Sequence, residues 1–472
     1  MRELPKHLRI VALWAGVFLG GLGVLPLRAQ MVWIGAGGNN NVSTAANWSG
    51  GTPTRGGNSN LTFAGSTRLA PAFDSGGWSV NSLTFASGAG AFTLAGGELT
   101  MGSGGLTNNS ANTQTINNQI KLAANQTWNA ASGAIVSTAY IDANSKALTL
   151  SGSSAITVSG YLNNVGTLNL SGSGNRTFNS SVSSATTNIA STGINTFNAQ
   201  INVGTLNISA GTSNIANAQV SAGTYVSGAS NVNFTGPVTG GGGITLDTSG
   251  NVTFSGNINS GSLTLNGSGT TTITGSGNMS TGAVTVNNGT LVMDHTGSAA
   301  INSSLTVNSG GTVTMTANNQ VPTWQTVTLN EGSTLNLNDT TQAIQNLIIT
   351  GDTTIDFGSG GSQLNVASYG SINITNDVTI TILNWDSSTD VFSGQQPANN
   401  TVVQVQYVDS GGTVYAAGTW GGGGGNGGFI TPGAPVPEPS TYGLIFVGSA
   451  LGFVGWRRWR ASRRRARCAP AA

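Results

Sequence analysis

The chain has 472 residues, of which 71 are glycine and only 7% are charged. Its net charge of +1 hides an uneven distribution, because the first 29 residues hold four Lys/Arg and the last 17 hold seven, while residues 30–436 carry five basic and 13 acidic residues. Such an acidic body lacks the clustered Lys/Arg that bind phosphates, which excludes nucleic acid as a partner. The single cysteine, Cys468, excludes disulfides, thiolate nucleophiles and Cys-ligated metals from the body.

Residues 1–29 have the organisation of a secretory signal peptide. Basic residues between Arg2 and Arg9 precede an uncharged apolar stretch, 10–25, and the small residue Ala29 supplies a cleavage position. An uncleaved membrane anchor is the alternative, but the apolar stretch is short for a spanning helix. We therefore expect this segment to direct export and then to be removed.

Residues 30–60, with Trp33 and Trp48, are expected to cap a body that repeats itself. In five consecutive units an aromatic position and an aliphatic position advance together in steps of 18 to 20 residues. We place the aromatic position at 178, 197, 216, 234 and 254 and the aliphatic position at 182, 201, 220, 238 and 258. Two positions that drift in step indicate a solenoid built from short repeats.

A second series of units follows with steps of 21 and 22 residues, in which Val284, Leu305 and Val327 begin equivalent segments. Each segment alternates apolar and polar residues before it reaches Gly, Asn or Ser. Alternation of this kind predicts strands with one buried face, and Gly and Asn predict turns with positive φ. The body shows no amphipathic helical period, so the sequence predicts an all-β fold.

These units predict a parallel β-helix over residues 61–375, in which each unit forms one coil. Coils lie at the strand spacing of about 4.8 Å, so roughly 15 of them make a rod about 70 Å long. Equivalent side chains then stack, and we expect hydrogen-bonded asparagine ladders at the turns and an internal phenylalanine ladder broken at Ala216. The phenylalanines are Phe178, Phe197, Phe234 and Phe254. One coil cannot bury its own apolar face, so stability grows through contacts between neighbours.

The stretch from Gly269 to Leu291 has a Thr-rich strand, a Gly/Ser/Asn turn and a second Thr/Val strand that ends in Asn-Asn-Gly-Thr-Leu. It resembles the autotransporter-associated β-strand repeat, and the resemblance implies a passenger-like, right-handed β-helix. The chain departs from that family at its C-terminus, which lacks the alternating, aromatic-flanked strands of a membrane barrel. We therefore expect export by another route.

Beyond the coils, residues 376–420 are expected to form a C-terminal cap with longer strands at 378–383 and 402–408. A cap at this end covers a sheet edge that would otherwise promote aggregation. The glycine-rich residues 421–436 are expected to be a flexible linker to the last segment of the chain.

Residues 437–472 combine a short motif, an uncharged apolar stretch and an arginine cluster, in that order. The motif is Pro437, Glu438 and Pro439, and the arginines that set the topology are Arg457, Arg458 and Arg460. As a helix, the stretch between them is just long enough to cross a thin bilayer, and the arginines behind it should stay in the cytoplasm. The combination resembles the PEP-CTERM sorting signal of Gram-negative bacteria.

The resemblance implies that an exosortase-type membrane protease recognises Pro437, Glu438 and Pro439, removes the tail and releases the body to the cell surface or the extracellular polymer. The membrane would then be a transient partner, held through the C-terminal helix until processing. A plain C-terminal anchor without processing is the alternative for residues 437–472.

Candidate catalytic groups in the body are few. His295 is the only histidine after the leader, and we interpret it as a surface residue in a turn rather than as a triad member with Asp294. Asp352 and Asp356 form an acid pair, but in a strand residues four apart lie about 13 Å from each other. This separation suits neither of the carboxylate arrangements used by glycoside hydrolases.

A second acid pair, Asp386 and Asp390, is better interpreted as a turn, with a calcium site as the less favoured alternative. The run 240–243 also predicts a turn, because no helix with a lysine follows it as in a phosphate-binding loop. Tryptophans of the body could stack on sugar rings, although such residues more often close the ends or fill the core. They are Trp33, Trp48, Trp78, Trp128, Trp324, Trp385 and Trp420. We expect no catalytic residue, no metal ligand and no cofactor.

The sequence thus predicts a non-enzymatic structural or adhesive β-solenoid that is sorted to the cell surface or the extracellular matrix. The alternative is a polysaccharide-binding or polysaccharide-degrading β-helix, with exopolysaccharide as the partner. A degrading enzyme needs charged residues clustered on one face, and five basic residues spread over the body make that cluster hard to build. A classical autotransporter passenger is the third hypothesis.

Overall fold

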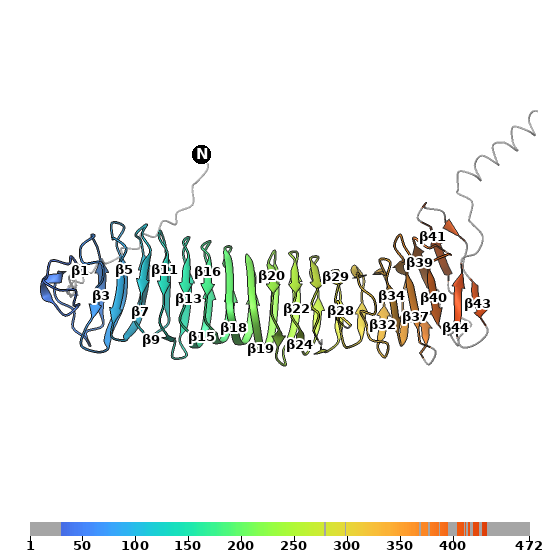
Figure 1. The fold of residues 1–472 in the computed structure, drawn as a ribbon, viewed down its shortest axis with the longest axis horizontal. Coiled ribbons are helices and arrows are strands. Elements are labelled where there is room, and N and C mark those ends of the chain that lie inside the picture. The colour runs from blue at the N-terminus through green and yellow to red at the C-terminus, as the bar shows by residue number, and fades with distance from the viewer. Residues whose placement is uncertain are drawn as a thin grey trace, which may run out of the picture.

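The computed structural model describes residues 30–431 apart from short gaps. The gaps are 278–279, 298, 368–369, 376–377, 387, 395–403, 410, 412–413, 416–418 and 424–426. The described chain winds into one rod of stacked coils, with β1 (Met31–Trp33) at one end and β43 (Thr419–Gly423) and β44 (Gly427–Thr431) at the other (Figure 1). The rod has about 16 turns, and nearly all of its strands pair in parallel. The all-β, parallel β-helix prediction is confirmed, and the handedness of the coil stays a prediction.

Each coil presents three faces, which we call A, B and C in the order in which the chain visits them. Face A contributes one strand per coil along the rod. Its strands are β3 (Ser59–Phe63), β5 (Trp78–Phe85), β7 (Leu99–Asn108), β10 (Gln126–Ala130), β13 (Ala147–Ser151), β15 (Leu162–Leu170), β17 (Val182–Ile189), β18 (Ile194–Ile208), β19 (Thr212–Gly228), β22 (Gly243–Thr248), β25 (Leu263–Leu265), β28 (Val284–Val286), β30 (Leu305–Val307), β32 (Thr326–Leu329), β35 (Asn346–Ile349) and β38 (Ile372–Ile374).

Face B follows face A in each coil and also pairs in parallel from coil to coil. Its separate strands are β4 (Ala72–Phe73), β6 (Thr93–Gly96), β8 (Gln114–Ile116), β11 (Ile135–Ser137), β14 (Ile156–Val158), β16 (Arg176–Phe178), β20 (Asn231–Phe234), β23 (Val252–Phe254), β26 (Thr270–Ile273), β29 (Gly289–Met293), β31 (Gly311–Met315), β33 (Ser333–Asn336), β36 (Thr353–Asp356), β39 (Thr379–Leu383) and β41 (Gln404–Val408). In the middle of the rod β18 and β19 are long enough to cover parts of all three faces.

Face C closes each coil and is the shortest of the three. Its separate strands are β9 (Ile120–Leu122), β12 (Ile141–Asp142), β21 (Val238–Thr239), β24 (Ile258–Ser260), β27 (Ser280–Thr281), β34 (Thr341–Ile344), β37 (Gln363–Val366) and β40 (Val391–Gly394). The first residues of β5, β7, β15 and β17 complete it in other coils. The last three strands belong to a separate five-stranded sheet that also contains β43 and β44.

Side chains alternate between the interior and the solvent along each strand, as the sequence predicts. In β28 the two valines are buried and Thr285 between them faces outward. Partners on face A form an interior column with one buried residue from each turn. The column is Leu61, Leu83, Leu106, Trp128, Leu150, Leu170, Ile189, Ile208, Val226, Leu246, Leu265, Val286, Val307, Leu329, Ile349 and Ile374. Burial of one such side chain contributes about 1.5–3 kcal/mol, so a coil is stable only between its neighbours.

The predicted register of the second series is confirmed, because Val284 pairs with Leu305 and Leu305 with Val327. The turns also have the predicted backbone. Gly289 adopts a φ of +72°, and a Cβ at that position would lie 2.4 Å from the carbonyl oxygen of Gly267 on the preceding coil. Only glycine fits such a turn at the coil spacing.

The predicted phenylalanine ladder exists as two stacked pairs. The rings of Phe178 and Phe197 lie 4.7 Å apart at 5°, and those of Phe234 and Phe254 lie 4.9 Å apart at 4°. The residue between the pairs was wrongly assigned, because Ile215, and not its neighbour at 216, lies opposite both Phe197 and Phe234. A buried aliphatic side chain therefore fills the gap, and the interior stays packed through this coil.

The aliphatic position of the same coil also needs correction. Ala218, and not Val220, pairs with Ile201 on one side and Val238 on the other. The register shifts after the aromatic position, because this coil has one residue fewer between its aromatic and aliphatic positions than the coil before it. Uniform spacing along the sequence does not show this missing residue.

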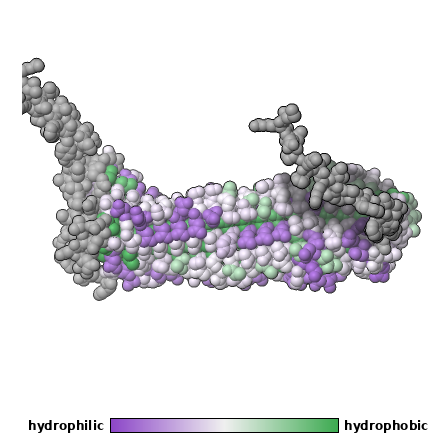
Figure 2. All heavy atoms as spheres, turned by 180° about the vertical axis from the view of Figure 1, so that it is seen from behind, coloured by the Kyte–Doolittle hydropathy of each residue, from purple (hydrophilic) through white to green (hydrophobic). Residues whose placement is uncertain are grey.

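Two asparagine ladders run along the outer surface, one on strand positions of face A, which was not predicted, and one at the turns, as predicted. Asn188 Nδ2 donates to Asn169 Oδ1 (2.9 Å), and Asn207 Nδ2 donates to Asn188 Oδ1 (2.8 Å). A second ladder of the same kind joins four residues that follow face-A strands. They are Asn266, Asn287, Asn308 and Asn330. In Figure 2 hydrophilic residues form rows that run lengthwise along the rod.

The N-terminal end is closed by local structure. Strand β1 pairs in parallel with β3 on one side and antiparallel with β2 (Trp48–Ser49) on the other, after the 3-10 turn η1 (Ala45–Asn47). The rings of Trp33 and Trp48 meet edge to face at 5.3 Å over the interior. Because β2 reverses direction, the free edge of the first coil does not continue the parallel ladder. The boundaries 30–60 for the cap stay a prediction.

The C-terminal end differs from the prediction in one respect. Strands β39 and β41, within the predicted cap 376–420, continue the parallel coils of face B, and β42 (Val414–Tyr415) turns back on β41. The linker predicted over 421–436 is wrong at 421–423 and 427–431, because β43 and β44 pair antiparallel there and β44 also pairs with β40. Backbone pairing needs no side chain, so a glycine run can extend a sheet when an edge strand is available. Residues 432–436 lie outside the described residues.

Candidate functional surfaces

Both predicted targeting segments lie outside the described residues. They are the signal peptide 1–29 and the sorting tail 437–472, with Pro437, Glu438, Pro439, Arg457, Arg458 and Arg460. Within the described ranges, no helix is both long and apolar enough to span a bilayer. The signal peptide, the apolar helix and the roles of these residues stay predictions.

His295 lies in the interior, so the predicted surface position is wrong. Its side chain is 1% exposed, and its backbone N–H donates to Gln320 Oε1 (2.9 Å) while Gln320 Nε2 donates back to the His295 carbonyl (3.0 Å). The next coil continues the contact, because the Gln320 N–H donates to Gln342 Oε1 (2.8 Å). A column of buried amides at one corner of the coils thus holds His295 in place.

The acid pair Asp352 and Asp356 is used by the fold. Asp352 Oδ1 accepts the backbone N–H of Thr379 (2.7 Å), and Asp356 Oδ1 accepts the N–H of Gly358 (3.0 Å) and Asn384 Nδ2 (2.7 Å). The two carboxylates therefore hold backbone and amide N–H groups of the same or the next coil.

Asp386 and Asp390 form the predicted turn, in which the Asp390 N–H donates to the Asp386 carbonyl (2.8 Å). Hydrogen bonds from the Ser388 hydroxyl and N–H hold the pKa of Asp386 below its usual value. Burial instead raises the pKa of Asp390, although its carboxylate accepts the N–H groups of Ser362 (2.7 Å) and Asp386 (2.6 Å). In the part of the chain that the structure describes, no three His, Cys, Asp or Glu side chains lie together as metal ligands would.

Five of the seven body tryptophans are buried. They are Trp33, Trp48, Trp78, Trp128 and Trp385. Of the other two, Trp324 is 63% exposed, and the side chain of Trp420 lies outside the described residues. The tryptophans thus mainly fill the core and close its ends.

The predicted glycine turn at 240–243 connects β21 to β22.

One buried charge was not predicted. Arg176 is fully buried in β16, and burial lowers its pKa to about 10. Its guanidinium donates to five backbone carbonyls at a corner of the coils, with Ser171 O the nearest at 2.7 Å. The carbonyls of Leu150, Gly152 and Asn175 also accept a backbone N–H, whereas the guanidinium is the donor found for the carbonyls of Ser154 and Ser171. The sign of this buried charge in the sequence is an arginine at the register position where the two preceding coils have Ile135 and Ile156.

An open groove follows the outer corner between faces C and A on the first coils. It consists of two adjoining cavities of about 410 and 240 Å³, and the exposed residue Ser103 lines both. Amide and hydroxyl side chains line it along five coils. They include Asn58, Asn81, Ser103, Asn125, Thr127 and Thr149. The groove leaves no motif in the sequence, because its residues come from separate repeats.

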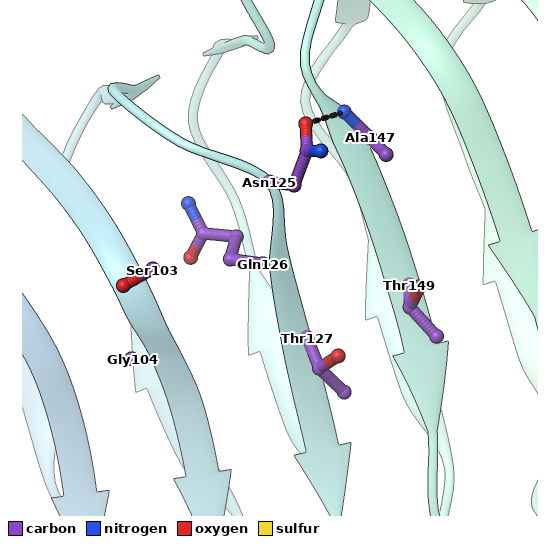
Figure 3. Close-up of a pocket in the computed structure, with 7 residues that line it drawn as sticks. All are labelled: Ser103, Gly104, Asn125, Gln126, Thr127, Ala147 and Thr149. Carbon is purple, nitrogen blue, oxygen red and sulfur yellow. Dashed lines mark hydrogen bonds between the residues drawn. The ribbon is translucent and has the colours of Figure 1, made fainter.

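Figure 3 shows one part of the groove, where Ser103 and Gly104 on β7 lie beside residues 125–127 at the start of β10 and residues 147–149 on β13. Asn125 Oδ1 accepts the backbone N–H of Ala147 (2.9 Å), which fixes the amide at the groove wall. Gly105 has a φ of +65°, and a Cβ there would lie 2.1 Å from the Thr127 carbonyl oxygen. Glycine is therefore required for the tight corner beside the groove.

Gln126 is the least expected residue of the groove. It occupies an interior position at which the next two coils have Leu148 and Leu168, and it is only 5% exposed. Its Oε1 accepts Trp128 Nε1 (3.2 Å), but its Nε2 has no hydrogen-bond partner among the described residues. A buried donor without a partner costs about 1–3 kcal/mol, so the fold alone does not favour this amide.

Comparison with known families identifies the PEP-CTERM protein-sorting motif at residues 435–460. This match confirms the resemblance based on the Pro-Glu-Pro motif, and it covers the part of the chain beyond the coils. Comparisons with curated proteins and with solved structures give no significant match. The resemblance of residues 269–291 to the autotransporter-associated repeat stays a prediction, although the body is a β-solenoid.

Proposed function

We propose that this chain is a non-enzymatic, surface-displayed β-solenoid with a structural or adhesive role, released by an exosortase-type protease. The observation that carries the proposal is a continuous parallel rod joined to a PEP-CTERM sorting motif. The motif implies export and an intermediate held at the membrane. The final location is the cell surface or the extracellular polymer.

A structural role is supported by the way the rod uses its polar groups. The outer asparagines hydrogen-bond to one another from coil to coil, and the two acid pairs bind backbone N–H groups. The body depends on stacked neighbours for its stability, which suits a stiff spacer that holds its outer surface away from the cell.

Mass spectrometry of the mature protein tests the sorting part of the proposal. We expect the surface form to lack residues 1–29 and the segment after the Pro-Glu-Pro motif. Glu438→Gln should leave the tail attached and the protein in the membrane fraction, whereas Glu331→Gln, which changes an exposed acid of the rod, should be processed normally. Normal processing of the Glu438→Gln variant would contradict the role of this motif.

A screen against acidic and neutral polysaccharides tests the non-enzymatic part. We expect no turnover by the purified mature protein. Turnover that disappears in Asp356→Asn, while the hydrogen-exchange pattern of the coils is retained, would replace this proposal with a polysaccharide-degrading enzyme. Because Asp356 binds two turn groups, the exchange measurement is needed to separate lost chemistry from lost structure.

A further inference from the structure

We propose that the groove between faces C and A of the first five coils binds a linear, neutral glycan chain. The inference rests on the proposed function, because it needs the rod to be displayed outside the cell. The groove spans residues 56 to 149, one segment per coil, and at the coil spacing this is a length of roughly 20 Å. A site that repeats along one axis suits a ligand that repeats in the same direction.

The lining determines the class of ligand. Every residue that lines the two cavities is Asn, Gln, Ser, Thr, Gly or Ala, so the groove offers no charge to pair with an ionic ligand. It also has no apolar side chain larger than alanine, so a hydrophobic ligand would gain little buried area. Hydroxyl and amide groups can both donate and accept hydrogen bonds, as the hydroxyls of a neutral sugar do.

The unpartnered amide of Gln126 is a second, independent observation. Gln126 is one of the residues that line the smaller cavity, and its Nε2 is buried and lacks an acceptor within the described ranges. Rotation of this amide toward the groove would bring the donor to a glycan hydroxyl and remove the cost of burying it unpaired. Asn125 is already held in position by Ala147, so part of the site is ordered before the ligand binds.

Exposed aromatic residues provide a competing location. Tyr140 and Tyr161 are each 38% exposed on adjacent coils, with ring centroids 6.0 Å apart, and Asn163 Nδ2 donates to the Tyr140 hydroxyl (3.1 Å). Aromatic faces can also stack on sugar rings, but these tyrosines lie at the opposite edge of face C and do not line the groove. Separate variants can therefore distinguish the two surfaces.

The test uses the mature surface form and measures the Kd for dextran and cellohexaose as neutral chains and for polygalacturonate as an acidic one. We expect at least one neutral chain to bind more tightly than polygalacturonate. Ser103→Trp places a large side chain in both cavities and should raise that Kd at least tenfold. Ser173→Trp, a matched change at an exposed serine on another corner, should leave the Kd unchanged.

Gln126→Leu is a second test of binding in the groove. Leucine should fit this position because it is the residue at the equivalent position of the next coil. We expect weaker neutral-glycan binding with coil protection against hydrogen exchange retained. Binding by none of the three chains, preference for polygalacturonate, or equal effects of the two tryptophan variants would overturn the proposal. Loss of binding in Tyr140→Ala but not in Ser103→Trp would also overturn it. Normal processing of Ser103→Trp shows that display is intact, so failure here is separate from failure of the proposed function.

Discussion

The ring stack between Phe178 and Phe197 permits a quantitative test of the coil register. Both side chains are 1% exposed, and their rings are parallel at 4.7 Å. Substitution by leucine keeps an apolar side chain but removes part of the ring volume, so each single variant should cost roughly 1–3 kcal/mol. The stack itself is worth about 0.5–1.5 kcal/mol. The double variant should therefore lose less than the sum of the single variants by that amount.

The assay is native-state hydrogen exchange, because a stack of coils can open locally and a single unfolding transition is not expected. The free energy of opening would be compared for amides of β16 and β18 in the two single variants and the double variant. The pair Phe178 and Phe254, which lie several coils apart, serves as the control and should give additive changes. Equal coupling in both pairs, or none in the stacked pair, would refute the register described here.

Four further predictions concern single residues. Gly105→Ala should destabilise the first coils by at least about 1 kcal/mol, measured as faster hydrogen exchange in β7 and β10, because of the positive φ and the nearby carbonyl oxygen. Asn188→Ala should lose up to about 2 kcal/mol, since it breaks two ladder hydrogen bonds, and unchanged exchange on face A would argue against the ladder. Arg176→Met should cost about 2 kcal/mol or more by leaving the carbonyls of Ser154 and Ser171 without donors, so unchanged hydrogen exchange in β16 would contradict this role. Burial raises the pKa of Asp390, so the folded state binds its proton more tightly than the unfolded state. Stability of the last coils should therefore fall as pH rises from about 4, the usual pKa of an aspartate, through the higher pKa of the folded state, and Asp390→Asn should remove that part of the pH dependence.

The repeat pattern predicted most of the fold because each strand obeys a local rule. Alternation fixes which side chains point inward, and a constant step fixes which of them meet on adjacent coils. The prediction of Val284 opposite Leu305 needed nothing else. It failed at Ile215 because this residue follows Phe197 by 18 positions, one fewer than the step from Phe178 to Phe197, and only pairing with Phe197 and Phe234 reveals which residue enters the interior.

The candidate surfaces were harder to predict. His295 was placed at the surface because a lone histidine gives no local sign of burial, whereas its amide partner Gln320 comes from the next coil. The strands around Gly421 were missed because glycine runs carry no side-chain pattern, and the available edge of β40 decides their pairing. The groove at Ser103 has no motif, since each coil contributes only a few of its atoms.

By itself the sequence determined the class of fold, the parallel direction of the strands and the sorting motif near the end of the chain. Those features follow from period, composition and a contiguous motif, all of which are local along the chain. Tertiary structure alone decided the lining of the neutral groove, the burial of His295 and the partners of Arg176. Each of these depends on residues about 20 positions apart that meet only when one coil lies on the next.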